Sequence, residues 1–242
     1  MGNYRSTVVP VADLSSDDIG RMAGLYLANY EASSVALFTG DLAEKDEAIL
    51  LYRGDELVGF TTLLVYAAPL PERAARIVYS GDTIVRPADW GQQELAFAWL
   101  RRIGEIKAQA PDLPLYWLLL VKGHRTFKYL SVFSKSFHPH WACERPDLKA
   151  LAEQLARARF GAHFRADRGI VAFPQSRGQL VAAIATPSPE ECSKPGTRFF
   201  LDKNPDYRSG HELVCLCELD QSNMKPLAAR IFAGAFKQAL AA

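Results

Sequence analysis

Residues 82–100 read DTIVRPADWGQQELAFAWL, and a change of hydrophobic period divides them into two elements. The β-branched run before Pro87 is typical of a strand, and the polar loop after it contains Gly91. From residue 95 the apolar side chains recur at helical spacing, at Leu95, Trp99, Ile103 and Ile106. The stretch therefore predicts a strand, a short loop and a helix. Such a junction is a natural anion-binding site, because free N–H groups and the positive end of the helix dipole converge there.

The preceding segments predict a helix followed by a β-hairpin. Residues 15–30 begin with capping serines and acids and continue with apolar side chains at helical spacing. AILLY and LVGFTTLLVY read as two strands, and Gly54 in the RGDE turn between them supplies a permissive backbone. A further strand, ARIVYSGDTIV, leads into the loop at Pro87.

The following segments continue the alternation of strand and helix. LPLYWLLLV is almost entirely apolar, as expected of a buried central strand, and RTFKYLSVFSKSF carries a stripe of apolar side chains: Phe127, Leu130, Phe133 and Phe137. The order helix, hairpin, strand, helix, strand, helix predicts an α/β (α+β) fold with a mixed sheet. The part from Arg76 to Val121 should form a right-handed parallel crossover.

FHPHWACERP marks a boundary between two parts of the chain. We expect residues 1–140 to form the core. Residues 141–242 contain a basic helix, a short strand, a proline-rich segment, the strand HELVCLCEL and a closing helix. The C-terminal strand is expected to complete the same sheet, which would make the chain one structural domain with a C-terminal extension.

Composition argues against several classes of protein. The 242 residues carry a net charge of +1, so the chain as a whole is not an electrostatic binder of nucleic acid. Its four cysteines form no CxxC pair and its histidines are scattered, so we expect reduced thiols and no metal site. The start of the chain has no secretory layout, and no apolar run approaches the ~18 residues that span a membrane. We expect a cytoplasmic protein without a transmembrane segment.

The loop after the strand contains neither a GxxxxGK[ST] nor a GxGxxG pattern. It resembles instead the cofactor loop of the GNAT superfamily, the Gcn5-related acyltransferases, with Val85, Pro87 and Gly91 in register. The order of elements over residues 15–138 is similar to that fold, which implies a GNAT-like mixed central sheet flanked by helices. Two positions depart from the family pattern: Trp90 replaces the usual Arg or Gln, and Gln93 replaces a second glycine.

The resemblance implies a co-substrate rather than a tightly bound cofactor, either acyl-CoA or an acyl-phosphopantetheine. The strand edge at Thr83, Ile84 and Val85 would hold the pantetheine arm. The loop, at Trp90, Gly91, Gln92 and Gln93, would meet the phosphate. Lys122 and Arg125 lie in a segment, residues 113–143, that has no acidic residue, and its cationic surface would attract coenzyme A phosphates or an acidic acyl carrier protein.

Acyl transfer to an amine needs a base for the ammonium proton and an acid for the leaving thiolate. The resemblance implies Tyr129 as the acid. Asp82 is unusual inside a strand, where aspartate is depleted, and Tyr79 lies three residues before it, so the two should point to opposite faces. His124, at the end of the next strand, and Glu31, on the first helix, are further candidates for the base.

Two hypotheses of different classes follow. The first is an acyltransferase that moves an acyl group from a thioester to the amine of a small molecule, with Gly81 leaving room for an acyl chain. The second is a non-catalytic GNAT-like domain that binds a lipid, an acyl chain or a protein partner through the same groove.

Overall fold

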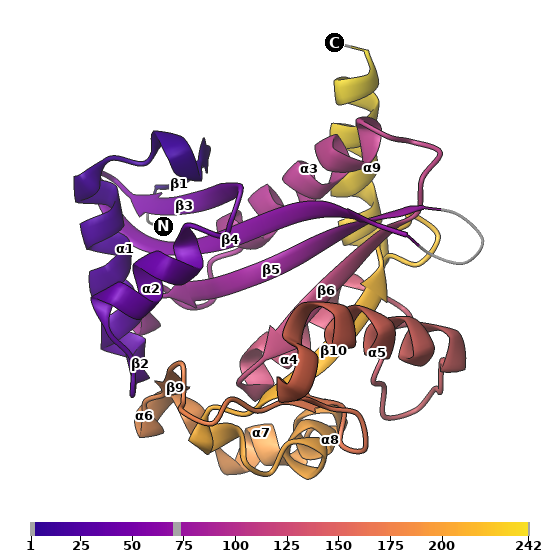
Figure 1. The fold of residues 1–242 in the computed structure, drawn as a ribbon. Helices are drawn as coiled ribbons and strands as arrows, with labels where there is room; N and C mark the ends of the chain where they lie inside the picture. Colours follow the sequence, from indigo (N-terminus) through magenta and orange to yellow (C-terminus); the bar gives the residue numbers. More distant parts are fainter. Residues whose placement is uncertain (1–2, 70–73, 242) are drawn as a thin grey trace.

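The computed structural model describes residues 3–69 and 74–241, which form a twisted eight-stranded sheet covered by helices (Figure 1). The strand order is β1-β3-β4-β5-β6-β10-β8-β7, and β5 and β6 are the parallel pair in an otherwise antiparallel ladder. The strands are β1 (Tyr4–Pro10), β3 (Glu47–Arg53), β4 (Glu56–Ala68), β5 (Ala75–Val85), β6 (Leu115–Val121), β7 (Phe164–Arg165), β8 (Ile170–Val171) and β10 (Glu212–Glu218). The predicted α/β class, with a mixed central sheet and flanking helices, is confirmed.

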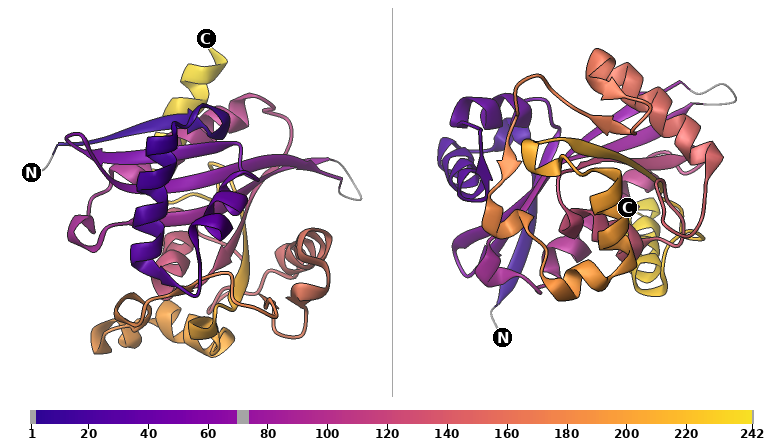
Figure 2. Two further views of the ribbon diagram at one scale, coloured as in Figure 1. Left: turned by 60° about the vertical axis from the view of Figure 1, so that its left-hand side comes forward. Right: turned by 90° about the horizontal axis from the view of Figure 1, so that it is seen from below.

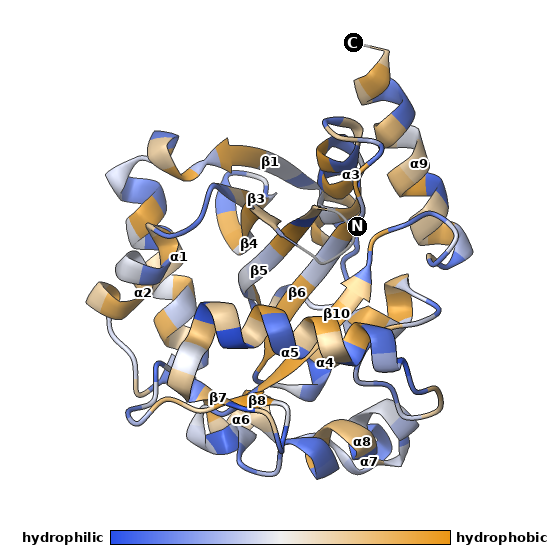
Figure 3. Ribbon diagram, turned by 45° about the vertical axis from the view of Figure 1, so that its right-hand side comes forward, coloured by the Kyte–Doolittle hydropathy of each residue, from blue (hydrophilic) through white to orange (hydrophobic). Residues whose placement is uncertain are grey.

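Helices cover both faces of the sheet. One face carries α3 (Glu94–Ala108), α4 (His124–Phe133) and α9 (Pro226–Leu240), and the opposite face carries α1 (Ser16–Asn29), α2 (Val35–Leu42) and α5 (Pro146–Phe160). The apolar side chains of β5, β6 and β10 alternate between these two layers, and Figure 3 shows the hydrophobic residues concentrated on the central strands. The core therefore sits on both sides of the central strands.

Three small helices of the C-terminal part lie together at one end of the sheet (Figures 1 and 2). They are α6 (Ala182–Ala185), α7 (Pro189–Ser193) and α8 (Pro195–Lys203). A two-residue strand, β9 (Gln179–Leu180), pairs with β2 (Tyr30–Glu31) at the end of α1. The C-terminal part thus reaches across to the N-terminal part, and β10 runs between β6 and β8 in the main sheet.

Several elements differ from the sequence prediction. Strand β1 and helix α2 lie in segments for which we predicted no element, and α7 and α8 form where the prolines suggested only a loop. Each of those prolines stands at the first turn of its helix, where a missing N–H costs nothing. The predicted stripe through Phe137 is also shorter than expected, because α4 ends at Phe133 and Phe137 is buried from the following loop.

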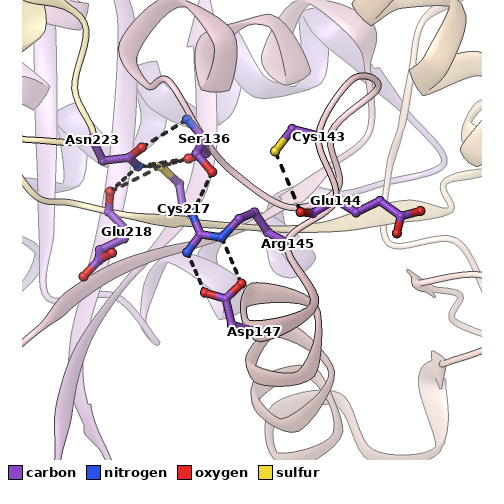
Figure 4. Close-up of polar contacts among 8 residues, drawn as sticks. All are labelled: Ser136, Cys143, Glu144, Arg145, Asp147, Cys217, Glu218 and Asn223. Atoms are coloured by element: carbon purple, nitrogen blue, oxygen red, sulfur yellow. Dashed lines mark hydrogen bonds and ion pairs between the residues drawn. The ribbon is translucent and has the colours of Figure 1, made fainter.

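The chain around the predicted boundary at residue 140 is held firmly against β10 (Figure 4). Asn223 accepts from Ser136 N at 3.0 Å and donates to the carbonyls of Ser136 and Glu218, each at 2.9 Å. Arg145 donates to Ser136 Oγ at 2.7 Å and pairs with Asp147. Cys217 is buried within this network, and burial raises the pKa of its thiol to about 12, so this cysteine is a core residue.

Strands β5 and β6 pair only from Arg76–Leu115 to Ser80–Leu119. Beyond that point β5 stays with β4 as far as Val85, while β6 stays with β10, so the two parallel strands separate. Trp117 Nε1 donates to Ser80 Oγ at 2.8 Å and fixes the last paired rung. The central sheet therefore opens where the sequence pattern placed the ligand site.

Candidate functional site

A cavity of about 550 Å³ lies over the separated ends of β5 and β6, on the face covered by α1, α2 and α5. We call it the Asp82 cavity. Tyrosine and phenylalanine rings form much of its wall, and charged side chains from four elements project into it. Its aromatic and charged lining includes Tyr26, Tyr30, Tyr79, Asp82, Lys122, Arg159, Arg177 and Glu212.

A β-bulge in β5 turns Asp82 into this cavity. Thr61 pairs with Thr83 and Leu63 pairs with Ser80, so two residues of β5, Gly81 and Asp82, oppose the single residue Thr62. The extra residue reverses the alternation of the strand. The prediction that Tyr79 and Asp82 point to opposite faces is therefore wrong, and both line the Asp82 cavity.

Among the described residues, no hydrogen bond or ion pair engages the Asp82 carboxyl, which is half-buried. Burial raises the pKa of Asp82 to about 7, against the lowering effect of the nearby Lys122. Lys122 itself pairs with the buried Glu212, with 3.3 Å between Nζ and Oε1. Burial opposes the charge on Lys122, but Glu212 and its other neighbours raise the pKa of Lys122 above its usual value. Asp82 is thus an unpaired carboxyl that titrates near neutrality.

A second hollow, of about 380 Å³, lies on the opposite face between the β5–α3 loop and α4. We call it the Trp90 cleft. Most of the residues predicted to hold the co-substrate line it: Thr83, Ile84, Val85, Trp90, Gly91, Gln92 and Arg125. Three residues, Tyr30, Thr83 and Thr126, line both the cleft and the Asp82 cavity. The two hollows therefore meet at the gap between β5 and β6.

In the loop beside the Trp90 cleft, two side chains form hydrogen bonds with nearby backbone groups. Trp90 Nε1 donates to Val85 O at 2.8 Å, and Gln92 Oε1 accepts from Leu95 N at 3.2 Å. Gly91 has a φ of +90°, a conformation that favours glycine. Gln93 is the N-cap of α3, makes no capping hydrogen bond with its side chain and lies outside the lining of the cleft.

Asp89 fixes this loop to the sheet. Its carboxyl is fully buried and pairs with Arg86 at 2.7 Å and with Arg53 at 2.9 Å, and it accepts from Tyr4 Oη at 2.9 Å. Burial opposes ionisation, but the hydrogen bonds from Arg86 and Tyr4 lower the pKa of Asp89. The loop is held rigidly by a carboxylate that sequence reasoning did not single out.

Helix α4 presents Tyr129 and His124 to the Trp90 cleft. Burial raises the pKa of Tyr129, so its hydroxyl keeps its proton over the physiological range. His124 is buried, and its Nε2 lies 3.3 Å from Glu191 Oε1 without hydrogen-bond geometry. Burial lowers the pKa of His124 despite that carboxylate. Glu191 also contacts Arg125 at 3.2 Å, and Arg125 stacks over the Trp90 ring at 4.5 Å.

The structure separates the remaining predicted residues. Lys122, predicted beside the co-substrate, lines the Asp82 cavity instead, because it turns toward Glu212. Glu31 is exposed on β2, accepts from Gln179 and lines neither hollow. The room expected beside Gly81 is filled, since a Cβ there would lie 2.3 Å from Thr62 Oγ1 and 2.6 Å from Lys45 Cε.

Sequence reasoning missed several acidic and basic residues of the Asp82 cavity, among them Arg159, Arg177 and Glu212. Glu212 had a signal, because a glutamate inside the apolar strand HELVCLCEL is as unusual as Asp82 in its own strand. Arg159 and Arg177 lie on α5 and on the segment before β9, and only the fold brings them to β5. Within residues 3–69 and 74–241, no group of three His, Cys, Asp or Glu side chains forms a metal site. Nor does that part of the chain contain a helix long and apolar enough to cross a membrane.

No family model matches this chain, and no curated protein does either. Solved structures that it resembles include an acyl-CoA N-acyltransferase from Pseudomonas aeruginosa, with 17% identity over 54% of this chain and 88% of that one, at a TM-score of 0.40. A GNAT family N-acetyltransferase from Escherichia coli, solved with CoA, matches at 14% identity over 54% and 69%, at a TM-score of 0.38.

A probable N-acyltransferase from Enterococcus faecalis matches at 10% identity and a TM-score of 0.41. The match covers 55% of this chain and only 33% of the Enterococcus protein. A likeness of this size describes part of a fold and says nothing about catalysis, which rests on this chain's own residues.

Proposed function

We propose that this chain is an N-acyltransferase that moves an acyl group from a thioester to the amine of a small molecule. The observation that carries the proposal is the meeting of two hollows at the gap between β5 and β6, with the unpaired Asp82 carboxyl on one side. The thioester would enter through the Trp90 cleft and the amine through the Asp82 cavity. Direct transfer between the two substrates needs this arrangement, because the reacting atoms must come within about 3–3.5 Å of each other.

Asp82 would act as the general base. It takes a proton from the ammonium group of the acceptor, and the free amine attacks the thioester carbon. The new C–N bond forms as the C–S bond breaks, and the nitrogen loses a second proton, which balances the proton gained by the leaving thiolate. The hydroxyl of Tyr129, which burial keeps protonated, is the candidate acid for the leaving thiolate. The geometry favours Asp82 over His124 as the base, because His124 lies against Glu191 on the far side of the gap.

The loop favours a donor that is held by few phosphate contacts. Gln92 already occupies the N–H of Leu95, so the start of α3 offers a phosphate one donor fewer. An acyl-phosphopantetheine on a carrier protein brings a single phosphate, so acyl-CoA and acylated carrier protein are both donors to be tested.

Trp90 Nε1 already donates to the carbonyl of Val85, on the strand edge that would hold the pantetheine arm. The same loop therefore also supports the second hypothesis, a binding domain without turnover. Amine-dependent release of thiol separates the two hypotheses. We expect release from acyl-CoA or acylated carrier protein, and a fall of about 10²–10⁴-fold in the Asp82→Asn variant. Asp46→Asn is the matched control, because Asp46 accepts from Val65 N away from both hollows.

Binding of either donor without amine-dependent release, over a broad panel of amines, would favour the non-catalytic domain. Release that Asp82→Asn leaves unchanged would remove Asp82 from the mechanism. The two outcomes are separate, because the first concerns the activity and the second concerns the base.

A further inference from the structure

The charged side chains of the Asp82 cavity pair with one another in part. Lys122 pairs with Glu212, and Asp41 pairs with Lys45 at 2.7 Å. After these pairs, one acid, Asp82, and two cations, Arg159 and Arg177, keep capacity for a ligand. The acidic and basic side chains that line the cavity are Asp41, Glu44, Asp82, Lys122, Arg159, His163, Arg177 and Glu212.

Arg159 is the stronger of the two cationic positions. Its guanidinium stacks over the Tyr79 ring at 4.3 Å and contacts Glu44 at 3.3 Å through Nη2 alone. The Glu44 carboxylate is 63% exposed, so that ion pair sits at the rim and contributes little. Arg159 Nε is buried and has no hydrogen-bond partner among the described residues. A buried donor left unpaired is destabilising, and an anion in the cavity would satisfy it.

Arg177 lies at the opening of the same cavity. Its guanidinium stacks over the Phe173 ring at 4.4 Å, and no acid pairs with it within the part of the chain that the structure describes. The carboxyl groups around the cavity and the Lys and Arg side chains balance in number, with four of each when Lys45 is counted with its partner Asp41. A ligand without net charge, with separate positive and negative ends, fits such a site better than an anion of two charges.

We infer that the amine accepted in the Asp82 cavity also carries a carboxylate, with its ammonium group at Asp82 and its carboxylate at Arg159. The inference rests on the proposed function, whose acceptor it specifies. Guanidinium binds carboxylate through parallel N–H donors, and Asp82 is the one acid without a partner in the cavity as described. The rings of Tyr79, Tyr26 and Phe160 offer an apolar wall for the rest of the acceptor. Amino acids are the simplest members of this chemical class.

The test measures binding by calorimetry, with and without coenzyme A, about one pH unit above the Asp82 pKa of about 7, where its carboxylate is charged. The probes are matched pairs that differ in the carboxylate: L-phenylalanine against phenethylamine, and 6-aminohexanoate against hexylamine. We expect the carboxylate-bearing member of at least one pair to bind about tenfold more tightly or better.

Variants show which residue causes the preference for the carboxylate-bearing amine. Arg159→Gln should abolish it, while Arg157→Gln, on the same helix and outside the cavity, should leave it unchanged. Glu44→Gln should keep the preference or increase it, because it removes the competing carboxylate. A purely structural Arg159 would not respond in this way. If Arg159→Gln fails to fold, Arg159→Lys and Arg177→Gln carry the test, each with an expected loss of several-fold in the preference.

Equal binding of both members of each pair would overturn the inference. So would a preference that persists in the Arg159 and Arg177 variants, or no binding of either zwitterion at about 10 mM. Failure of the proposed function gives a different result, namely selective binding of the carboxylate-bearing amine without any release of thiol from a donor.

Discussion

Asp82 couples the proposed chemistry to the stability of the fold. Burial raises its pKa from the usual 3.8 to about 7, so the folded chain holds a proton over this pH range that the unfolded chain has released. Stability therefore falls as pH rises from about 4 to about 7. This direction is opposite to that of most carboxylates in folded proteins.

We expect Asp82→Asn to stabilise the protein above pH 7, because the amide carries no charge to bury. The gain in the free energy of unfolding should reach about 4 kcal/mol at high pH and vanish near the usual pKa of 3.8. Urea denaturation at several pH values measures it. A gain that does not depend on pH would contradict the burial of a titrating carboxyl at this position.

The contribution of Asp89 to stability changes with pH in the opposite direction to that of Asp82. Although burial opposes its charge, Arg86 and Tyr4 lower its pKa, so its contribution is present above pH 3.8 and is lost as pH falls through the lower, folded value. We expect Asp89→Asn to destabilise the protein at neutral pH by about 3 kcal/mol, because Arg53 and Arg86 lose their buried partner. The same denaturation series measures both variants, and a loss below about 0.5 kcal/mol would contradict this account of the loop.

At the scale of the element, the bulge in β5 decides which side chains share the Asp82 cavity. Gly81 permits it, because the space that a Cβ would occupy holds Thr62 Oγ1 and Lys45 Cε. Without the extra residue, Asp82 would face α3 and α4 rather than the Asp82 cavity. The proposed base is therefore positioned by a break in the regular strand.

We expect Gly81→Ala to cost about 1–3 kcal/mol, since the new methyl group overlaps two packed side chains. Gly20→Ala is the matched control, because Gly20 lies within α1 with nothing within 4 Å of its added Cβ. That change should stabilise the protein by about 0.5–1 kcal/mol. Thermal unfolding compares the two, and equal effects would contradict the packing described at the bulge.

The elements themselves follow closely from the sequence where periodicity is strong, as in α1, α3, α5 and β6. Strand β1 escaped prediction because it is an edge strand whose side chains are mostly exposed, so its pattern carries little burial signal. The bulge was not predicted, because one extra residue in a strand leaves no signal in the amino-acid composition. It reverses the faces of Tyr79 and Asp82, and the error in the predicted site follows from that single residue.

At the scale of the whole molecule, the C-terminal part closes the outer side of the Trp90 cleft. Glu191, on α7, contacts His124 at 3.3 Å and Arg125 at 3.2 Å, and it accepts from Ser188 N at 2.8 Å. Burial opposes its charge, but the bond from Ser188 and the neighbouring cations lower the pKa of Glu191 to about 2. The carboxylate thus ties the C-terminal part to α4.

We expect Glu191→Gln to loosen this connection at a cost of about 1–2 kcal/mol, because a neutral amide replaces the carboxylate in its contacts with Arg125 and Ser188. Amide hydrogen exchange over residues 182–203 should become faster in this variant. Glu190→Gln is the control, because the Glu190 side chain is 85% exposed and contacts Lys194 at the surface. Identical exchange in the two variants would contradict the role given to Glu191.

Residues distant in the sequence meet at the Asp82 cavity, and this explains why sequence reasoning found only part of it. Tyr79 and Asp82 lie on β5 and were identified from the strand pattern, and Lys122, directly after β6, was identified from the acid-free segment around it. Arg159 and Arg177 come from the C-terminal part, and nothing in their local sequence links them to β5. The charge balance that supports the inferred acceptor is therefore visible only in the folded chain.

The most direct test of the account is the dependence of kcat/KM for acyl transfer on pH. We predict that kcat/KM rises through a step with its midpoint near pH 7, where Asp82 loses its proton, and that Asp82→Asn loses this step together with most of the activity. A profile without a step near pH 7, or the same step in Asp82→Asn, would contradict the assignment of Asp82 as the base.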